Sequence, residues 1–167
     1  WLRSLCVRHF TQEIFCRMQK QLKGDISMKK FRVHHILCTV LYQGEGYSGA
    51  FCDNMTQKVH ELKDNLDGAL ILVTDPDMIC AHCPNRTPDD TCLDEKNHVK
   101  IKDLELLKLF GWEENKSYSY YELLLDAAGK MDAKEFTRSC GKCRWYKEGL
   151  CSYEMWRKNA EEILRKK

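Results

Sequence analysis

The sequence lacks the features that mark a protein of membranes, nucleic acid or the cell exterior. Its 27 basic and 25 acidic residues leave a formal net charge of +2, so no charge excess favours nucleic acid or an anionic membrane. No apolar run approaches the ~20 residues of a membrane-spanning helix. Residues 1–27 carry charges throughout and show no apolar core or small-residue cleavage site, which argues against a signal peptide. We expect a cytoplasmic protein with no nucleic-acid or membrane partner.

The chain also has too little cysteine for a small secreted disulfide scaffold. Ten cysteines in 167 residues is a high content, yet it lies below the density of such scaffolds. Reduced thiols are then the default, and paired cysteine spacings indicate metal binding or catalysis before they indicate disulfides. The length, with 43% hydrophobic and 31% charged residues, predicts one soluble domain with its own core.

The first 27 residues differ from the rest of the chain. They hold two cysteines and several basic residues but no pattern of a packed element. Met28 is the first methionine able to start a compact domain, and residues 23–25 can be encoded by a purine tract like a bacterial ribosome-binding site. We predict that residues 1–27 are a translated leader or a disordered extension, and that residues 28–167 form one cysteine-rich metal-binding domain. A genuine N-terminal helix or tail is the alternative.

Apolar periodicity predicts a mainly α domain of the α+β class, with one or two short strands and with cysteine-rich metal loops as staples. The apolar run at 31–43 is compatible with helix or strand, and its length and Gly44 favour helix. The β-branched run at 69–74 predicts a strand that leads into a cysteine cluster. Ser48 and Ser152 are suited to N-cap the helices that follow them. Helical spacing predicts further helices over 49–65, 99–110, 118–128, 133–138 and 152–167.

Six of the ten cysteines form two similar sets. Each set is a C-x-x-C pair followed by a third cysteine, in a loop with turn-forming residues. The sets are Cys80, Cys83 and Cys92, and Cys140, Cys143 and Cys151. Two thiolates at this spacing bind one metal centre from a single tight turn. A thioredoxin-type motif is disfavoured because neither pair follows the first strand of a βαβ unit. The pattern therefore predicts a metal or iron–sulfur site.

Each set is one ligand short of four, and Cys38 is the leading candidate for the missing one. If its segment is helical, His34 and His35 lie one turn before Cys38, so that a nitrogen and a sulfur share one face. The alternatives are a small buried Cys38 and hydrogen-bonded core histidines. We expect His82 to point away from the metal and Cys52 to be structural.

Two weaker patterns are interpreted as structural. The glycines at 44, 46 and 49 match the dinucleotide fingerprint as a string, but they are predicted to join two helices, where glycine serves backbone turns. The tyrosines at 118–121 and the four tryptophans have no basic stripe beside them, so we expect packing rather than stacking on nucleic acid. No Ser-His-Asp order or carboxylate pair is evident from spacing.

Several segments together resemble one family. They are residues 32–38, 44–48 and 75–80, with Phe51, Asn54 and Met55. Through these segments the chain is similar to the domain of unknown function 1284 family of bacterial and archaeal proteins. The similarity runs from about residue 31 to residue 151. The most specific parts are the His-His-x-x-Cys segment and the Gly-Tyr-Ser loop. The resemblance implies an iron–sulfur centre, places His34, His35 and Cys38 in the functional core, and brings no reaction with it.

Three functions follow as hypotheses. The first is an iron–sulfur protein with the six cluster cysteines and Cys38 as ligands, on one centre or two, acting as a structural or sensing centre or in electron transfer with a redox partner protein. The second is a zinc-stapled interaction module with two sites. The third is a metal-dependent enzyme in which His34 or His35 acts beside an open metal position. Thiolate ligands suit both iron–sulfur clusters and zinc, so the ligand type does not separate the first two.

Overall fold

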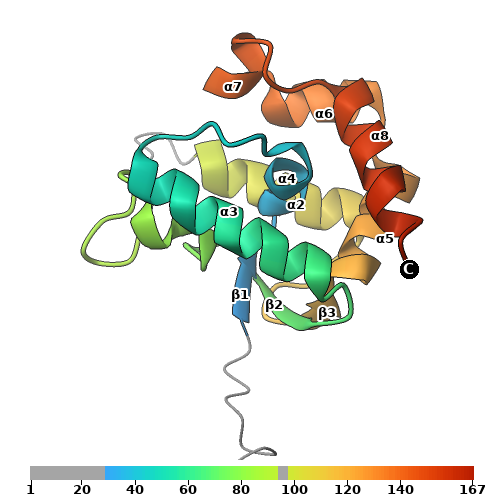
Figure 1. Cartoon of the computed structure of the whole chain (residues 1–167), viewed down its shortest axis with the longest axis horizontal. Helices are drawn as coiled ribbons and strands as arrows, with labels where there is room; N and C mark the ends of the chain where they lie inside the picture. Colours follow the sequence, from blue (N-terminus) through green and yellow to red (C-terminus); the bar gives the residue numbers. More distant parts are fainter. Residues whose placement is uncertain (1–28, 94–97) are drawn as a thin grey trace, which may run out of the picture.

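The structure is a computed structural model that describes residues 29–93 and 98–167. The described residues form seven α-helices, one 3₁₀ helix and a three-stranded sheet (Figure 1). The strands are β1 (Lys29–Arg32), β2 (Ala69–Val73) and β3 (Ser117–Ser119), and the helices are α2 (His35–Leu41), α3 (Gly49–Asp64), η1 (Ile79–His82), α4 (His98–Phe110), α5 (Tyr120–Lys130), α6 (Ala133–Cys140), α7 (Arg144–Lys147) and α8 (Tyr153–Leu164). The predicted α+β class is confirmed. The leader prediction for residues 1–27 lies outside the described residues.

The three strands form one sheet in the order β1-β2-β3. Strands β1 and β2 are parallel, and β2 and β3 are antiparallel. Parallel neighbours require a crossover connection, which α2 and α3 supply here. The predicted strand at 69–74 is therefore the central one, and the chain leaves it directly into the first cysteine cluster.

The prediction of one helix over 31–43 is wrong at its start. Phe31 and Arg32 belong to β1, and the helix begins only at His35. Phe31 pairs with Leu72 of β2 and is fully buried, so sheet pairing with a distant segment determines its conformation. Local periodicity contains no information about that partner. Strand β3 was missed for the same reason.

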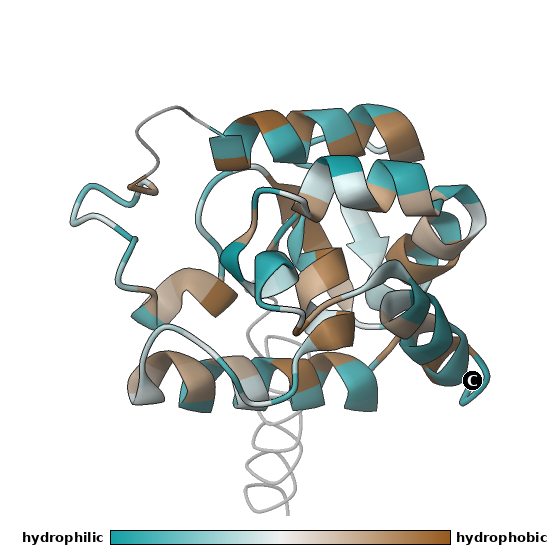
Figure 2. Cartoon of the chain, turned by 90° about the horizontal axis from the view of Figure 1, so that it is seen from above, coloured by the Kyte–Doolittle hydropathy of each residue, from teal (hydrophilic) through white to brown (hydrophobic). Residues whose placement is uncertain are grey.

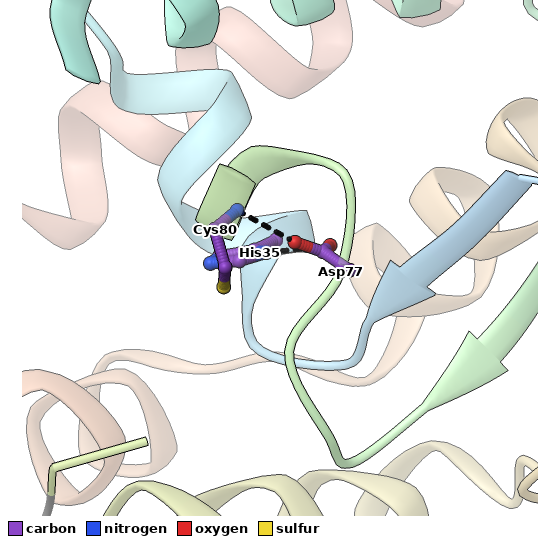
Figure 3. A group of neighbouring side chains, drawn as sticks. All are labelled: His35, Asp77 and Cys80. Atoms are coloured by element: carbon purple, nitrogen blue, oxygen red, sulfur yellow. Dashed lines mark hydrogen bonds and ion pairs between the residues drawn. The ribbon is translucent and has the colours of Figure 1, made fainter. Parts of the chain in front are cut away.

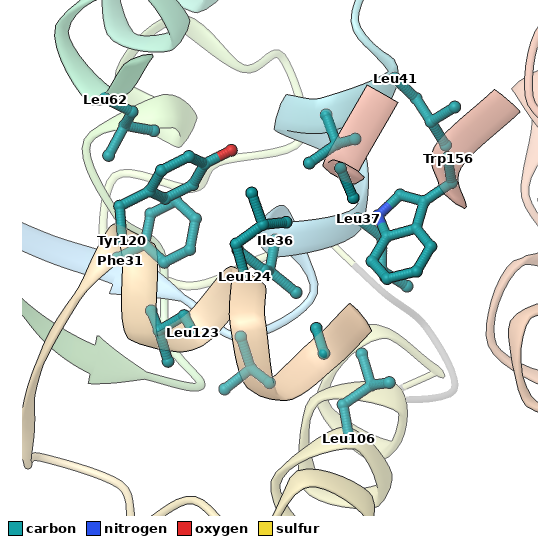
Figure 4. Packing of buried hydrophobic residues seen from close by; sticks show 14 of the residues in the cluster. Phe31, Ile36, Leu37, Leu41, Leu62, Leu106, Tyr120, Leu123, Leu124 and Trp156 are labelled. Atoms are coloured by element: carbon teal, nitrogen blue, oxygen red, sulfur yellow. The ribbon is translucent and has the colours of Figure 1, made fainter. Parts of the chain in front are cut away.

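Helix α2 lies in the middle of the core. It contacts α3, α5 and α8, and its Ile36 and Leu37 are buried beside Leu124 and Trp156 (Figure 4). Hydrophilic and hydrophobic residues alternate along the peripheral helices, as expected for helices with one face on a core (Figure 2). The position of α2 explains how a short helix can present side chains to several other elements.

Local capping defines the helix starts that the sequence predicts. The hydroxyls of Ser48 and Ser152 accept hydrogen bonds from the amides of Phe51 and Met155, at 3.2 Å each. Residues 42–48, which hold two of the three glycines of the dinucleotide-like string, join α2 to α3, so the expected helix–helix loop is confirmed. Within the described ranges, no helix combines the length and apolarity needed to cross a membrane.

Candidate metal centres

The first cysteine loop follows β2 and is built around a tight turn. The amide of Cys83 donates to the carbonyl of Cys80 at 3.0 Å, which closes the C-x-x-C turn. The chain then doubles back: the amide of Leu93 donates to Asn85 at 2.7 Å, and a β-bridge pairs residues 86 and 92. This reversal returns Cys92 toward Cys83.

The second cysteine loop repeats this construction. Cys140 ends α6, and the amide of Cys143 donates to its carbonyl at 2.8 Å. After the single turn of α7, Gly149 adopts a φ of +76°, and the amide of residue 150 donates to Trp145 at 2.9 Å. A positive φ is the conformation that glycine adopts without strain. The chain thereby turns back and delivers Cys151 to the same site.

Cys38 lies beside the second set. Its side chain lines a cavity of about 190 Å³ together with Cys140, Cys143 and Cys151. Much of the remaining lining is apolar, with Leu37, Leu41 and Met55 on one side and Trp145, Tyr146 and Leu150 on the other. Four thiols around one apolar cavity are the donor set of a closed metal–thiolate centre. The residues therefore suit the group that the resemblance implies.

The environment of these thiols favours a cationic centre. Burial raises the pKa of Cys38 well above its usual value, and the neighbouring thiols of Cys140, Cys143 and Cys151 raise it further, while Lys102 opposes them. Burial likewise raises the pKa of Cys140 to about 11. Without metal the thiols keep their protons, because several buried thiolates would repel one another. A bound cation that displaces the protons removes that penalty.

In the described part of the chain, the cysteine sulfurs are not gathered at the mutual distances of ligands on one bound ion. Four thiolates on one zinc ion, at about 2.3 Å from the metal, lie about 3.8 Å from one another. Among the described residues, the one group of three potential ligand atoms within 4.8 Å of one another is His35, Asp77 and Cys80, and no three cysteine sulfurs meet that limit.

The cavity around Cys140, Cys143 and Cys151 is called the first cavity below. Next to it lies a second cavity of about 140 Å³, which the other cysteine set lines. Cys80, Cys83 and Cys92 share it with His34 and His35. Burial raises the pKa of the Cys80 thiol to about 12, and the guanidinium of Arg32 opposes this shift. Cys38 lines both cavities. The two loops thus serve two neighbouring cavities, and Cys38 stands between them.

Each of the two histidines is held by a buried aspartate. His34 Nδ1 donates to Asp103 at 2.7 Å, and His35 Nδ1 donates to Asp77 at 2.8 Å. Both carboxylates are fully shielded from solvent. Burial lowers the pKa of His34 to about 4, against the pull of Asp103. The imidazoles are thereby fixed in orientation, with their second ring nitrogens left for another partner.

Sequence reasoning missed both aspartates. A signal for Asp103 was present, since it shares the buried face of α4 with Leu106, Leu107 and Phe110, and a carboxylate on such a face requires a partner. Asp77 gives a weaker signal as a residue before a short turn. Of the residues expected to lie away from the metal, His82 is exposed and Cys52 lines neither cysteine cavity.

Comparison with known proteins supplies the family. Residues 46–149, more than half of the chain, match the family described as "Protein of unknown function (DUF1284)". The chain belongs to this family. No curated protein and no solved structure matches it.

The match to DUF1284 is narrower than the resemblance that the sequence suggested. It contains both C-x-x-C pairs and Cys92. His34, His35 and Cys38 precede it, and Cys151 lies just beyond its end. The family description assigns no function, so the ligand set is argued from the cavities alone.

Proposed function

We propose that this member of DUF1284 is an iron–sulfur protein whose cluster is held by Cys38, Cys140, Cys143 and Cys151. The observation that supports this most strongly is the convergence of four thiols on one largely apolar cavity. Iron–sulfur clusters are held by four cysteine thiolates and supply one-electron chemistry when bound. A zinc ion on the same four thiolates is the alternative that metal analysis decides.

We propose electron transfer with a redox partner protein as the role of this centre. A centre with four thiolates leaves no open position for a substrate, which disfavours Lewis-acid catalysis. Leu150 lines the cavity and is 39% exposed, so the centre lies close to the molecular surface. The chain's own residues here bind the centre, exclude water through the apolar lining and keep it near a partner.

Reduced thiols support a cytoplasmic location. All eight cysteines of the described ranges are free of disulfides. Metal ligation requires such free thiols, and reducing compartments maintain them. We therefore propose a cytoplasmic protein of bacteria or archaea, in keeping with the resemblance.

The test replaces Cys38 by serine and compares it with a matched cysteine. Cys52 is half-buried but lines neither cavity. After anaerobic purification, we expect Cys38→Ser to lose the iron, the acid-labile sulfide and the visible charge-transfer absorption that this one cluster contributes, and Cys52→Ser to keep all three. Equal iron and sulfide in wild type and Cys38→Ser would remove Cys38 from the ligand set. Stoichiometric zinc in a colourless wild-type protein would reject the iron–sulfur function itself.

A further inference from the structure

The second cavity holds a donor set that the proposed cluster does not use. Besides Cys38, three thiols and two imidazoles line its walls, from η1 and the residues after it, from the returning loop and from the start of α2. The iron–sulfur cluster proposed above for the first cavity already has four ligands, with Cys38 as its fourth. The set around the second cavity is therefore available for a centre of its own.

The compact group of His35, Asp77 and Cys80 is a support for ligands rather than a three-ligand ion site. Oδ2 of Asp77 accepts hydrogen bonds from His35 Nδ1 at 2.8 Å and from the amide of Arg32 at 2.7 Å. Its Oδ1 accepts from the amides of Ile79 at 2.9 Å and Cys80 at 3.2 Å. Four donors satisfy the acceptor capacity of a carboxylate. Asp77 is thus fully engaged, and it fixes the positions of the His35 ring and the Cys80 backbone.

This arrangement leaves Nε2 of His35 as a ligand atom. In metal sites a coordinating imidazole typically donates its other N–H to a carboxylate, which sets the tautomer and the ring orientation. Figure 3 shows the His35 ring beside Asp77 and Cys80, and one ring nitrogen, an oxygen of Asp77 and the sulfur of Cys80 lie within 4.8 Å of one another. The side chain of His35 is 9% exposed, so it is shielded from competing water. An imidazole and a thiol thus lie within reach of one centre.

We propose that the second cavity holds a second metal centre, an iron–sulfur cluster ligated by Cys80, Cys83, Cys92 and Nε2 of His35. It rests on the proposed function for the identity of the metal and for the assignment of Cys38 to the other cluster. Three cysteine thiolates with one imidazole are a donor set that an iron–sulfur cluster accepts. Arg32 faces Cys80 and Cys92, and its positive charge offsets the negative charge of a thiolate-bound cluster.

His34 is the neighbour that provides the matched control. Its ring lies 4.4 Å from that of His35, centroid to centroid, and its Nδ1 is also held by a buried aspartate. It lines the same cavity, but it is not part of the compact group with Cys80. An effect of burial or of general loosening would appear in both histidine variants, whereas ligation is specific to His35.

The experiment is pulsed electron paramagnetic resonance of the reduced protein, together with iron and sulfide analysis. Wild type should show the nitrogen hyperfine coupling of a directly bound imidazole. His34→Ala should keep that coupling, and His35→Ala should lose it with roughly half of the iron and sulfide. His35→Cys, which replaces the nitrogen by a thiolate, should keep the iron and lose the coupling, and it answers the question if His35→Ala does not fold.

Further outcomes separate this inference from the proposed function. Cys140→Ser removes a ligand of the first cluster only, and it should retain the nitrogen coupling. If Cys140→Ser loses all iron, one centre serves both loops, and the second centre is overturned while an iron–sulfur function stands. Wild type that contains iron but shows no nitrogen coupling, or a coupling lost only in His34→Ala, overturns the assignment to His35. A zinc-only wild type overturns both.

Discussion

Asp103 connects three parts of the chain through one buried carboxylate. Its Oδ2 accepts from Arg32 Nε at 2.7 Å, and its Oδ1 accepts from the amide of His34 at 2.9 Å as well as from the ring. Burial alone would raise the pKa of Asp103, but His34 and Arg32 together lower it. A buried charge of this kind is tolerated only because its partners are in place. The end of β1, the start of α2 and α4 therefore depend on one side chain.

Replacing Asp103 by asparagine should lower the free energy of unfolding by about 3 kcal/mol. The change removes the negative charge and leaves the buried guanidinium of Arg32 uncompensated. The matched control is Asp75→Asn, because Asp75 is 68% exposed and only 3.5 Å from Lys100, where a surface ion pair contributes little. Chemical denaturation of both variants measures the difference. Equal losses would show that the Arg32–Asp103 pair is not structurally important.

Lys102 places a cation beside the thiols of the first cavity, and it lowers the pKa values of Cys38 and Cys140 against the dominant effect of burial. A nearby positive charge stabilises the more negative, reduced form of a cluster. Lys102→Gln should therefore shift the midpoint potential downward by roughly a few tens of millivolts. Lys108→Gln, an exposed lysine on the same helix, is the control. Potentiometric titration that finds no difference between the two variants would contradict this placement of charge.

At the scale of elements, the loop between α2 and α3 depends on close packing. A Cβ at Gly46 would lie 2.6 Å from the ring of Phe51 and 2.7 Å from Sγ of Cys52. Phe51 is buried in the core and cannot move away freely. The loop backbone therefore lies against α3, close to the helix that carries Cys38.

Gly46→Ala should destabilise the protein by about 1–3 kcal/mol, because the added methyl overpacks this contact. Gly49→Ala is the control: it lies in the first turn of α3, and no atom comes within 4 Å of its added Cβ. Alanine favours helix over glycine, so this second variant should be neutral or slightly stabilising. Thermal unfolding of both proteins gives the comparison. A Gly46→Ala protein as stable as Gly49→Ala would contradict the close approach.

The elements also show what the sequence can and cannot predict. The five longer helices from Gly49 onward follow from periodicity and serine caps, because both are local properties, whereas the single turns η1 and α7 were not predicted. The pairing of Phe31 with β2 is not local, and neither is the contact between His34 and Asp103, which are 69 positions apart. Cys38 could be proposed as the missing ligand from counting alone. Which of the two cysteine sets it joins depends on the tertiary packing of α2.

At the scale of the whole molecule, the first cavity joins residues of α2, α3, α4, α6 and α7 with Cys151. Helix α7 lies between Cys143 and Cys151 at the edge of the fold (Figure 1) and contains no fully buried residue. Its Trp145 and Tyr146 pack only partly against the core, so we expect the two flanking cysteines and the centre they bind to contribute much of its stability. A metal centre at this position contributes its binding free energy directly to the stability of that region.

Removal of metal should loosen this region first. In the apo protein, hydrogen exchange of the amides at 141–150 should increase by at least about tenfold, whereas α3 and α5, which pack in the core, should change little. Amide exchange followed by mass spectrometry, with and without an iron chelator under anaerobic conditions, gives the measurement. If the amides at 141–150 exchange equally slowly with and without the chelator, the second cysteine loop is held by protein contacts alone.

The central claim is that four cysteines, including Cys38, hold an iron–sulfur cluster. The most direct measurement is iron, zinc and acid-labile sulfide per chain in anaerobically purified protein, together with the visible spectrum before and after reduction. We predict a coloured protein with iron and sulfide in equal amounts, little zinc, and absorption that bleaches on reduction. A colourless protein with stoichiometric zinc and no sulfide would contradict the account.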